Sequence, residues 1–324
     1  MKQNLLVTLA DRNYIEQAKQ LFSSVYWNAG WKGDYMLLAH EIPEKDLKWF
    51  RDRGILIKKC KPLYDKTIGT DGHPGIVVTK FYLFTPEFKK WKNVVYLDAD
   101  IIVRSSLEDI TKFKKFAAVT EIYMGKLCAL KNQFNNIHLK IFDEVKKEYN
   151  LNTVSFNAGL MSFNTDIIND NTFDHLKNLL IKYNSICHYG EQAILNLFFY
   201  KKWSKIPLIY NVCINYALEY PPKKAIVFHF AGIKKGQKPW DSENTFYEEW
   251  KRNLEKAELI DLKKIFPKKS EVLEIQIYHL FLKIKFPVVS FFQEINRLIG
   301  QIGLAIKKRD SNLYYKLKKI KDRK

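Results

Sequence analysis

Two aspartates, Asp98 and Asp100, interrupt a mostly apolar stretch that reads NVVYLDADIIV over residues 93–103. The apolar residues on both sides predict a buried strand, and side chains two positions apart on a strand point the same way. Both carboxylates can therefore converge on one point, where they would repel each other at neutral pH unless a cation neutralised them. Oxygen ligands suit Mg²⁺ or Mn²⁺, and an added imidazole would favour Mn²⁺. The alternative is that the pair only caps a turn at the end of the strand.

The segments around this stretch alternate between strand-like and helix-like patterns. We expect strands over 4–10, 35–40, 54–60, 156–164 and 225–232, and helices over 13–29, 43–53, 77–84, 134–150, 165–183 and 191–200. Such alternation predicts an α/β fold whose sheet is mostly parallel and carries helices on both faces. Ligands of these sheets bind beyond the carboxyl ends of the strands. This expectation puts both aspartates at the mouth of a crevice.

The composition indicates a globular protein with a substantial core. A length of 324 residues fits one large domain or two ordinary ones, and 47% of the residues are hydrophobic. The four cysteines form no C-x-x-C pair, which argues against a zinc cluster or a disulfide framework and favours a reduced, cytoplasmic setting. The first residues lack the apolar core of a signal peptide and are expected to form a strand.

Six segments of the sequence resemble segments of a known protein family, and they occur in the same order as in that family. They are LVTLADRNY (6–14), VTKFYLF (78–84), VVYLDADIIV (94–103), FNAGLMSFN (156–164), GEQAILN (190–196) and HFAGIKKGQKPW (229–240). Together they resemble the family 8 glycosyltransferases, the group that includes glycogenin and bacterial lipopolysaccharide galactosyl- and glucosyltransferases. The resemblance implies an α/β GT-A fold with a mixed sheet and helices on both faces. We assign residues 1–245 to this catalytic domain and 246–324 to a helical basic tail.

The resemblance also implies a UDP-sugar donor, Mn²⁺ (or Mg²⁺) as cofactor, and transfer with retention at the anomeric carbon. Asp98, Asp100 and His229 would be the metal ligands, although a lone histidine in an apolar strand is more often a core residue. The remaining donor-binding positions that match are Leu9, Asp11, Tyr14, Lys80, Ala99, Ala158, Gly232 and Lys238. Asp11 could equally cap the first helix, and Lys80 could be a solvated helix residue. Lys234 or Lys235 could share the phosphate role with Lys238, because this segment is longer than in glycogenin.

Three further residues match positions that surround the donor sugar in the family, namely Asn157, Glu191 and Gln192. Gln192 stands where the family has a glutamine near the anomeric carbon. Because an amide is a weak nucleophile, the resemblance favours a same-face substitution through an oxocarbenium-like state over a double displacement. Glu191 replaces the usual aspartate, so the sugar preference of relatives does not carry over directly.

The last quarter of the chain is strongly basic. Residues 251–324 hold 19 Lys and Arg against 8 Asp and Glu, a net charge of +11 out of +19 for the whole chain. Lysines and a proline break its apolar runs, so it cannot span a bilayer, but it could form an amphipathic helix on an anionic membrane surface. The alternative is a helix packed on the catalytic domain. No motif that reads nucleic-acid grooves is present, so nucleic acid is not an expected partner.

We therefore expect an enzyme that transfers glucose or galactose to a glycan or glycolipid acceptor, such as lipopolysaccharide or another cell-surface glycan, at the cytoplasmic face of a membrane. One alternative is self-glycosylation, as in glycogenin, because the chain has 18 tyrosines. Another is a catalytically inactive membrane-associated binding protein, which would need a broken metal triad. A glycoside hydrolase is disfavoured because that chemistry needs two carboxylates flanking the scissile bond. The sequence sets no expectation for the oligomeric state.

Overall fold

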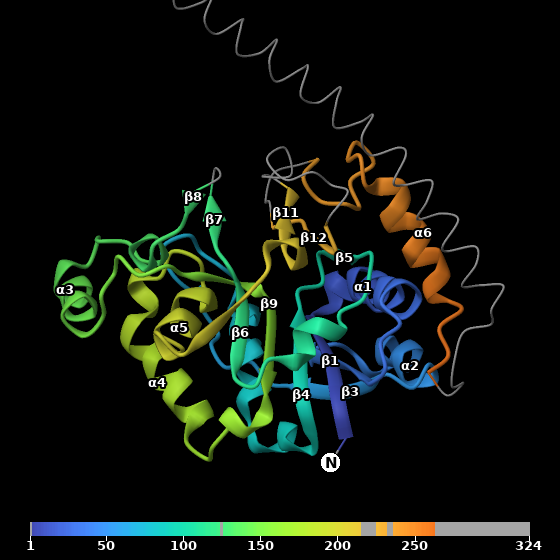
Figure 1. Cartoon of the computed structure of the whole chain (residues 1–324), viewed down its shortest axis with the longest axis horizontal. Helices are drawn as coiled ribbons and strands as arrows, with labels where there is room; N and C mark the ends of the chain where they lie inside the picture. The colour runs from blue at the N-terminus through green and yellow to red at the C-terminus, as the bar shows by residue number, and fades with distance from the viewer. Residues whose placement is uncertain (1, 124–125, 215–224, 232–235, 263–324) are drawn as a thin grey trace, which may run out of the picture.

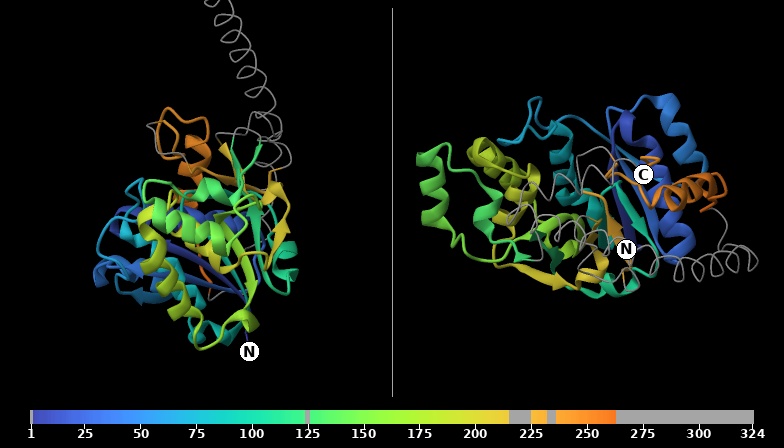
Figure 2. Two further views of the ribbon diagram at one scale, coloured as in Figure 1. Left: turned by 90° about the vertical axis from the view of Figure 1, so that its left-hand side faces the viewer. Right: turned by 90° about the horizontal axis from the view of Figure 1, so that it is seen from above.

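A sheet with helices on both faces forms the centre of the molecule (Figures 1 and 2). In this computed structural model, the described residues are 2–123, 126–214, 225–231 and 236–262. The sheet has seven strands in the order β10-β6-β9-β4-β1-β2-β3. Their bounds are β1 (Lys2–Ala10), β2 (Asp34–His40), β3 (Leu56–Cys60), β4 (Trp91–Leu97), β6 (Phe116–Thr120), β9 (Phe156–Asn164) and β10 (Trp203–Ile206).

The sheet is mixed because β9 runs antiparallel to both of its neighbours, β4 and β6. The other pairings in the sheet are parallel. Every residue of β9 is buried, as expected of a central strand whose two faces are both covered. The expectation of a mostly parallel sheet is therefore correct except at β9, and the mixed sheet that the resemblance implies is confirmed.

The alternation of side chains along β1 divides the core into two layers. Leu5 and Val7 pack on one face with residues of the 3₁₀ helix η2 (Gly75–Phe84), whereas Leu6 packs on the other face with Leu21 of the first α-helix. The α-helices are α1 (Ile15–Asn28), α2 (Glu44–Asp52), α3 (Leu139–Glu148), α4 (Thr172–Tyr183), α5 (Glu191–Phe198) and α6 (Tyr247–Ala257). Helices α1, α2 and α6 lie on one side of the sheet, and α3, α4 and α5 on the other (Figure 1).

The predicted single strand over 93–103 is wrong, because the chain turns at Asp98–Asp100 and changes sheet. Residues up to Leu97 belong to β4, whereas β5 (Ile101–Val103) joins a separate sheet of order β11-β12-β5. In that sheet β12 (Val227–His229) runs antiparallel to β5 and parallel to β11 (Val212–Cys213). The two aspartates thus lie in the seam between a large and a small sheet.

Helix α6 packs on the domain rather than standing apart from it. The indole Nε1 of Trp27 on α1 donates to the carbonyl of Lys256 at 3.3 Å. Arg104, directly after β5, forms a buried ion pair with Glu249 on α6, with Nε 2.8 Å from Oε1, and its guanidinium lies 4.3 Å from the ring centroid of Phe228. The predicted boundary at residues 245/246 therefore falls just before a helix that is part of this packing. Residues 263–324 of the predicted basic tail lie outside the described residues.

Two other predicted helices differ from the structure. Residues 75–84 form the 3₁₀ helix η2, which is flanked by Pro74 and closely followed by Pro86. Within the predicted helix over 134–150, α3 occupies only 139–148, since Phe134 forms a β-bridge with Cys187 instead. A small pair of strands, β7 (Ile122–Tyr123) and β8 (Lys126–Leu127), follows β6.

Candidate active site

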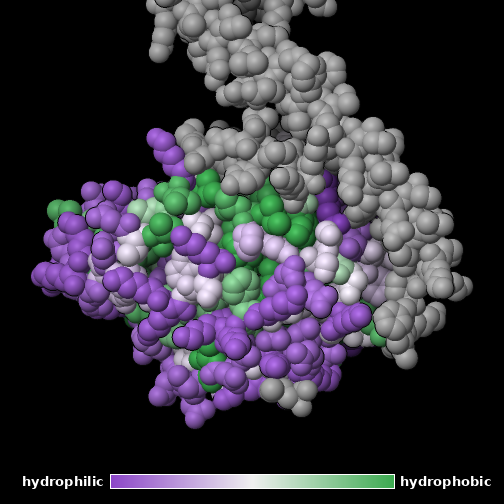
Figure 3. All heavy atoms as spheres, viewed as in Figure 1, coloured by the Kyte–Doolittle hydropathy of each residue, from purple (hydrophilic) through white to green (hydrophobic). Residues whose placement is uncertain are grey.

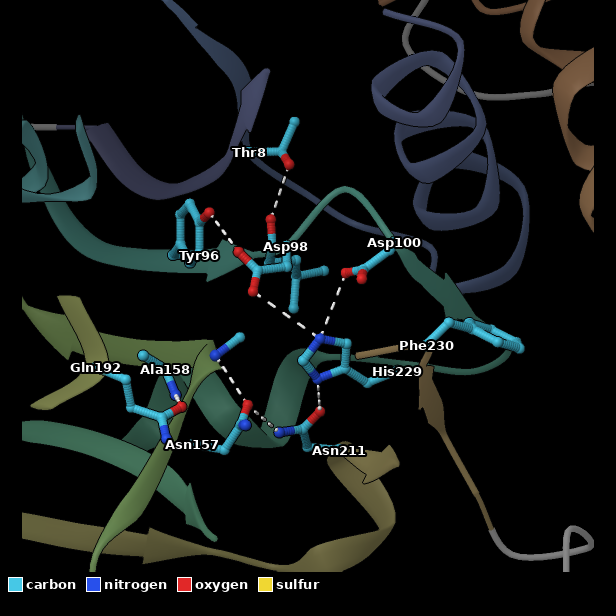
Figure 4. Close-up of polar contacts among 12 residues, drawn as sticks. Thr8, Tyr96, Asp98, Asp100, Asn157, Ala158, Gln192, Asn211, His229 and Phe230 are labelled. Atoms are coloured by element: carbon cyan, nitrogen blue, oxygen red, sulfur yellow. Dashed lines mark hydrogen bonds and ion pairs between the residues drawn. The ribbon is translucent and has the colours of Figure 1, made fainter. Parts of the chain in front are cut away.

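The turn that carries the two aspartates is fixed by backbone hydrogen bonds from both sheets. The N–H of Asp98 donates to the carbonyl of Gly159 on β9 at 2.8 Å, and the carbonyl of Asp100 accepts from the N–H of Phe230 at 3.0 Å. The hydroxyl of Thr8 on β1 donates to the carbonyl of Leu97 at 2.8 Å. The carboxylates therefore converge because the backbone turns between them, and not through the strand alternation that the sequence suggested (Figure 4).

Asp98, Asp100 and His229 form a compact cluster, as predicted from the sequence. Each offers a ligand atom, and these atoms lie within 4.8 Å of one another. Nε2 of His229 lies 3.9 Å from Oδ2 of Asp98 and 3.3 Å from Oδ1 of Asp100. Two carboxylate oxygens and one imidazole nitrogen face one another across this space.

The outer oxygens of the same two carboxylates are held by lysines. Oδ1 of Asp98 lies 2.9 Å from Nζ of Lys80, and it also accepts from the Tyr96 hydroxyl at 2.6 Å. Oδ2 of Asp100 accepts from Nζ of Lys238 at 2.6 Å. Burial alone would raise the pKa of Asp100, but Lys238 and His229 outweigh it and hold that pKa well below its usual range. Asp100 is therefore an anion throughout the physiological range.

This donor set fits a divalent cation. Two carboxylate oxygens with one imidazole nitrogen suit Mn²⁺ or a similar ion, and the outer oxygens are already oriented by Lys80 and Lys238. The predicted ligands Asp98, Asp100 and His229 are thus the residues that would hold the metal.

The affinity of this cluster for Mn²⁺ should rise with pH. Burial would lower the pKa of His229, but the Asp100 carboxylate outweighs it and raises that pKa well above 6.5. Below the raised pKa, a metal must displace the proton on the imidazole, so affinity should increase with pH by up to about tenfold per pH unit until that pKa is passed. Titration of Mn²⁺ followed by electron paramagnetic resonance would measure it. The slope should vanish in His229→Gln, and an affinity independent of pH in the unchanged protein would contradict the assignment.

Several other predicted donor-binding residues lie beside this cluster or in the core next to it. Asp11 caps the 3₁₀ helix η1 (Arg12–Tyr14), since its Oδ1 accepts from the N–H groups of Asn13 and Tyr14. The Tyr14 ring meets Trp240 edge-on at 5.8 Å between centroids, and burial raises the pKa of its hydroxyl. Leu9 is a buried core residue, and Ala99 is buried in the turn between the aspartates. Gly232, Lys234 and Lys235 lie outside the described residues.

Lys80 is buried and not a solvated helix residue. Its Nζ lies 2.5 Å from Oε1 of Glu191 and 2.9 Å from Oδ1 of Asp98, so two predicted site residues pair with each other here. Burial lowers the pKa of Lys80, but the two carboxylates outweigh it and raise that pKa above its usual value. The ammonium therefore stays charged and pairs with both acids.

Replacing Lys80 with Met should destabilise the protein strongly. The change leaves the buried Glu191 and the partly buried Asp98 without this cation, and removing one partner of a buried ion pair costs about 3–5 kcal/mol. Urea unfolding in EDTA would measure the free energy of unfolding. The double variant Lys80→Met/Glu191→Gln should recover part of the loss because one buried charge is then removed. Equal stability of Lys80→Met and the unchanged protein would show that the pair contributes little.

The predicted residues around the donor sugar form a network of amides behind the metal cluster (Figure 4). The side-chain oxygen of Gln192 accepts from the N–H of Ala158 at 2.9 Å, and its amide nitrogen donates to Glu121 and to Gln133 at 3.1 Å each. Asn157 donates to the same oxygen of Glu121 at 2.8 Å. The backbone N–H of Ala158 and both amides are thus engaged within the protein.

Three polar residues of this network, Glu121, Gln133 and Asn211, were not predicted from the sequence. Burial raises the pKa of Glu121, whose carboxylate receives the amides of Asn157 and Gln192. Asn211 contacts both Asn157 and His229. An acid directly after the apolar run FAAVT was a possible signal for Glu121, whereas the two-residue strand after Asn211 offered none.

Comparison with solved structures identifies the fold as that of the GT-A glycosyltransferases. The galactosyltransferase LgtC, solved with donor and acceptor sugar analogues, matches with a TM-score of 0.59 at 17% identity, over 82% of this chain and 98% of that one. The glycosyltransferase GlyE of Streptococcus pneumoniae TIGR4 matches with a TM-score of 0.57 at 20% identity, over 85% and 63% of the two chains.

The chain belongs to glycosyl transferase family 8, whose model matches residues 5–244. Galactinol synthase 1 of Ajuga reptans is 25% identical over 211 residues, which are 62% of each chain. The glycosyltransferase GlyB of Streptococcus pneumoniae serotype 4 is 26% identical over 190 residues, or 53% of this chain and 41% of that one. The match thus spans about 62% of the length of the galactinol synthase and less than half of GlyB.

Proposed function

We propose that this protein is a retaining, metal-dependent glycosyltransferase that transfers a hexose, glucose or galactose, from a UDP-sugar to a glycan or glycolipid acceptor. The observation that carries the proposal is the arrangement of Asp98, Asp100 and His229, whose inner ligand atoms face one another while lysines hold the outer oxygens. Mn²⁺ is the expected ion, with Mg²⁺ as the alternative. Bound there, the metal would act as a Lewis acid that neutralises the diphosphate of the leaving group.

The residues around the cluster suit a nucleoside diphosphate. Lys238 bonds Asp100 and the carbonyl of Phe230, so its ammonium lies where it could stabilise the negative charge that grows on the departing UDP. Tyr14 and Trp240 form an aromatic wall on the same side, which could receive the base. This set of residues supports UDP as the carrier of the sugar.

The network around Gln192 supports retention by same-face substitution. The amide nitrogen of Gln192 is fully used by Glu121 and Gln133, and its oxygen already accepts from Ala158. A neutral amide held in this way is a poor nucleophile, but the remaining lone pair on its oxygen can stabilise a positively charged anomeric carbon. The acceptor hydroxyl would then attack from the side that UDP leaves.

A lipid-linked acceptor at the cytoplasmic face of a membrane fits the surface and the charge of the chain. Apolar side chains gather in the upper middle of the face seen in Figure 3, near β7, β8 and β11, while its lower part is mostly hydrophilic. Leu127 of β8 is 58% exposed. Among the described residues, no helix has the length and apolar character needed to cross a bilayer. We therefore propose peripheral attachment, with the basic residues of 251–324 meeting anionic lipid.

The first test is incubation of the full chain with Mn²⁺ and a panel of UDP-sugars without acceptor. Slow release of UDP from one donor, lost with EDTA, is the expected result and would name the sugar. Intact-mass measurement of the same samples should show no added hexose, since a mass increase would indicate self-glycosylation. Absence of both UDP release and Mn²⁺-dependent UDP binding would contradict the proposal.

A further inference from the structure

A chain of hydrogen bonds runs from the backbone of β9 to the imidazole of His229, on the side away from the aspartates (Figure 4). Oδ1 of Asn157 accepts from the N–H of Gly159 and from Nδ2 of Asn211, both at 2.9 Å. Oδ1 of Asn211 lies 3.0 Å from Nδ1 of His229. Asn157, Asn211 and His229 are all buried.

The orientation of each amide in this hydrogen-bond chain is set by neighbouring groups that can only donate or only accept a hydrogen bond. A peptide N–H only donates, so the atom of Asn157 that faces Gly159 must be its oxygen. Its NH₂ group then points to the carboxylate of Glu121, which accepts at 2.8 Å. Both ends of the Asn157 amide are therefore fixed.

The fixed oxygen of Asn157 in turn orients Asn211. The atom of Asn211 that approaches this oxygen at 2.9 Å must be the NH₂ group, which leaves its own oxygen facing Nδ1 of His229. An amide oxygen only accepts, so Nδ1 must carry a proton. We propose that Asn157 and Asn211 form a relay that keeps the imidazole proton on Nδ1 and leaves Nε2 of His229 as the nitrogen that binds the metal.

The relay assigns Asn157 a positioning role. This residue was expected next to the donor sugar, but its oxygen and its NH₂ group are engaged by Gly159, Asn211 and Glu121. It acts on the metal cluster through Asn211 and does not touch His229 in any hydrogen bond of the described residues. Partners of this kind typically change metal affinity by about 10–100-fold. The inference rests on the proposed function, because it requires His229 to be a ligand.

The relay can be tested with Asn211→Leu, Asn211→Asp and Asn157→Leu in the full chain. Mn²⁺ affinity in the presence of UDP would be measured by electron paramagnetic resonance. Asn211→Leu should weaken it by about 10–100-fold, whereas Asn211→Asp keeps an acceptor for Nδ1 but loses the donor to Asn157, so it should recover part of the loss. Asn157→Leu should also weaken binding, since Asn211 is then free to turn its NH₂ group toward Nδ1.

A spectroscopic measurement separates the relay from a general loss of structure. In ¹⁵N-histidine-labelled protein with Mg²⁺ and UDP, His229 should show a protonated, slowly exchanging Nδ1, and the His229→Gln variant would assign the signal. This signal should persist in Asn211→Asp and weaken in Asn211→Leu and Asn157→Leu. An unprotonated Nδ1 in the unchanged protein would overturn the relay.

A matched control is available in the chain. Asn164→Leu removes a buried amide from the far end of the same strand. It should not alter the Nδ1 signal, and Mn²⁺ affinity should stay within about threefold. Mn²⁺ affinity in Asn211→Leu equal to that of the unchanged protein would overturn the relay alone, whereas failure of the unchanged protein to bind Mn²⁺ would overturn the proposed function with it.

Discussion

Asp100→Asn should abolish turnover, with a loss of at least about 10³-fold in UDP-sugar consumption. The substitution removes the charge that holds Lys238 at 2.6 Å and faces Nε2 of His229 at 3.3 Å. A neutral amide can neither bind a divalent cation as strongly nor keep this ammonium in place. Released UDP, measured with Mn²⁺ and the preferred donor, is the readout.

Two controls distinguish this loss of turnover from a loss of folding stability. Asp174→Asn, which alters an exposed ion pair with Lys177 on α4, should leave turnover unchanged. Thermal melting in EDTA should show that Asp100→Asn remains folded. Full activity in the folded Asp100→Asn variant would rule out Asp100 as a metal ligand.

Gly159→Ala should reduce activity nearly as far, although Gly159 carries no side chain. A methyl group at this position would overlap Cε1 of His229 and lie 2.9 Å from both Nδ1 of His229 and Oδ1 of Asn157. The imidazole must then leave its present position, because Gly159 lies in β9, which is fully buried and leaves its backbone little room to shift. We expect UDP release to fall by about 10²-fold or more and Mn²⁺ binding to weaken with it.

Gly72→Ala is a suitable control for the added methyl group. A Cβ at Gly72 meets no atom within 4 Å, so the only expected penalty comes from its positive φ of 66°. That penalty should be about 1 kcal/mol in stability, with Mn²⁺ binding unchanged. Unaltered Mn²⁺ affinity in Gly159→Ala would indicate that His229 does not need its present position.

The order of the main elements could be predicted because hydrophobic residues recur with a regular period in the sequence. The two aspartates of the metal cluster could be predicted because they are close together in the sequence. The alternation of strands and helices up to Cys60 matches the structure closely, since each element has a clear hydrophobic period. Asp98 and Asp100 stand out as charges within an apolar run. Their convergence was expected, but for a different reason, since a turn between two sheets brings them together.

The residues that support the cluster could not be predicted in the same way. Glu121 follows β6 and Asn211 precedes β11, strands of five and two residues that are too short to show a period. Their partners Asn157 and His229 are more than 15 residues away in the chain, so only the folded topology brings them together. The pairing of Lys80 with Glu191, 111 residues apart, is hidden for the same reason.

The ion pair between Arg104 and Glu249 has a consequence for the smallest unit that can fold. A chain shortened to residue 245 would retain everything that the family model matches, yet it would lose α6 and the Glu249 carboxylate. It would also uncover the apolar side chains of Phe228 and Phe230 next to His229. Losing a buried partner costs about 3–5 kcal/mol, a large part of the 5–15 kcal/mol that typically stabilises a domain. Deletions that aim to keep a functional metal cluster should therefore begin beyond Leu262.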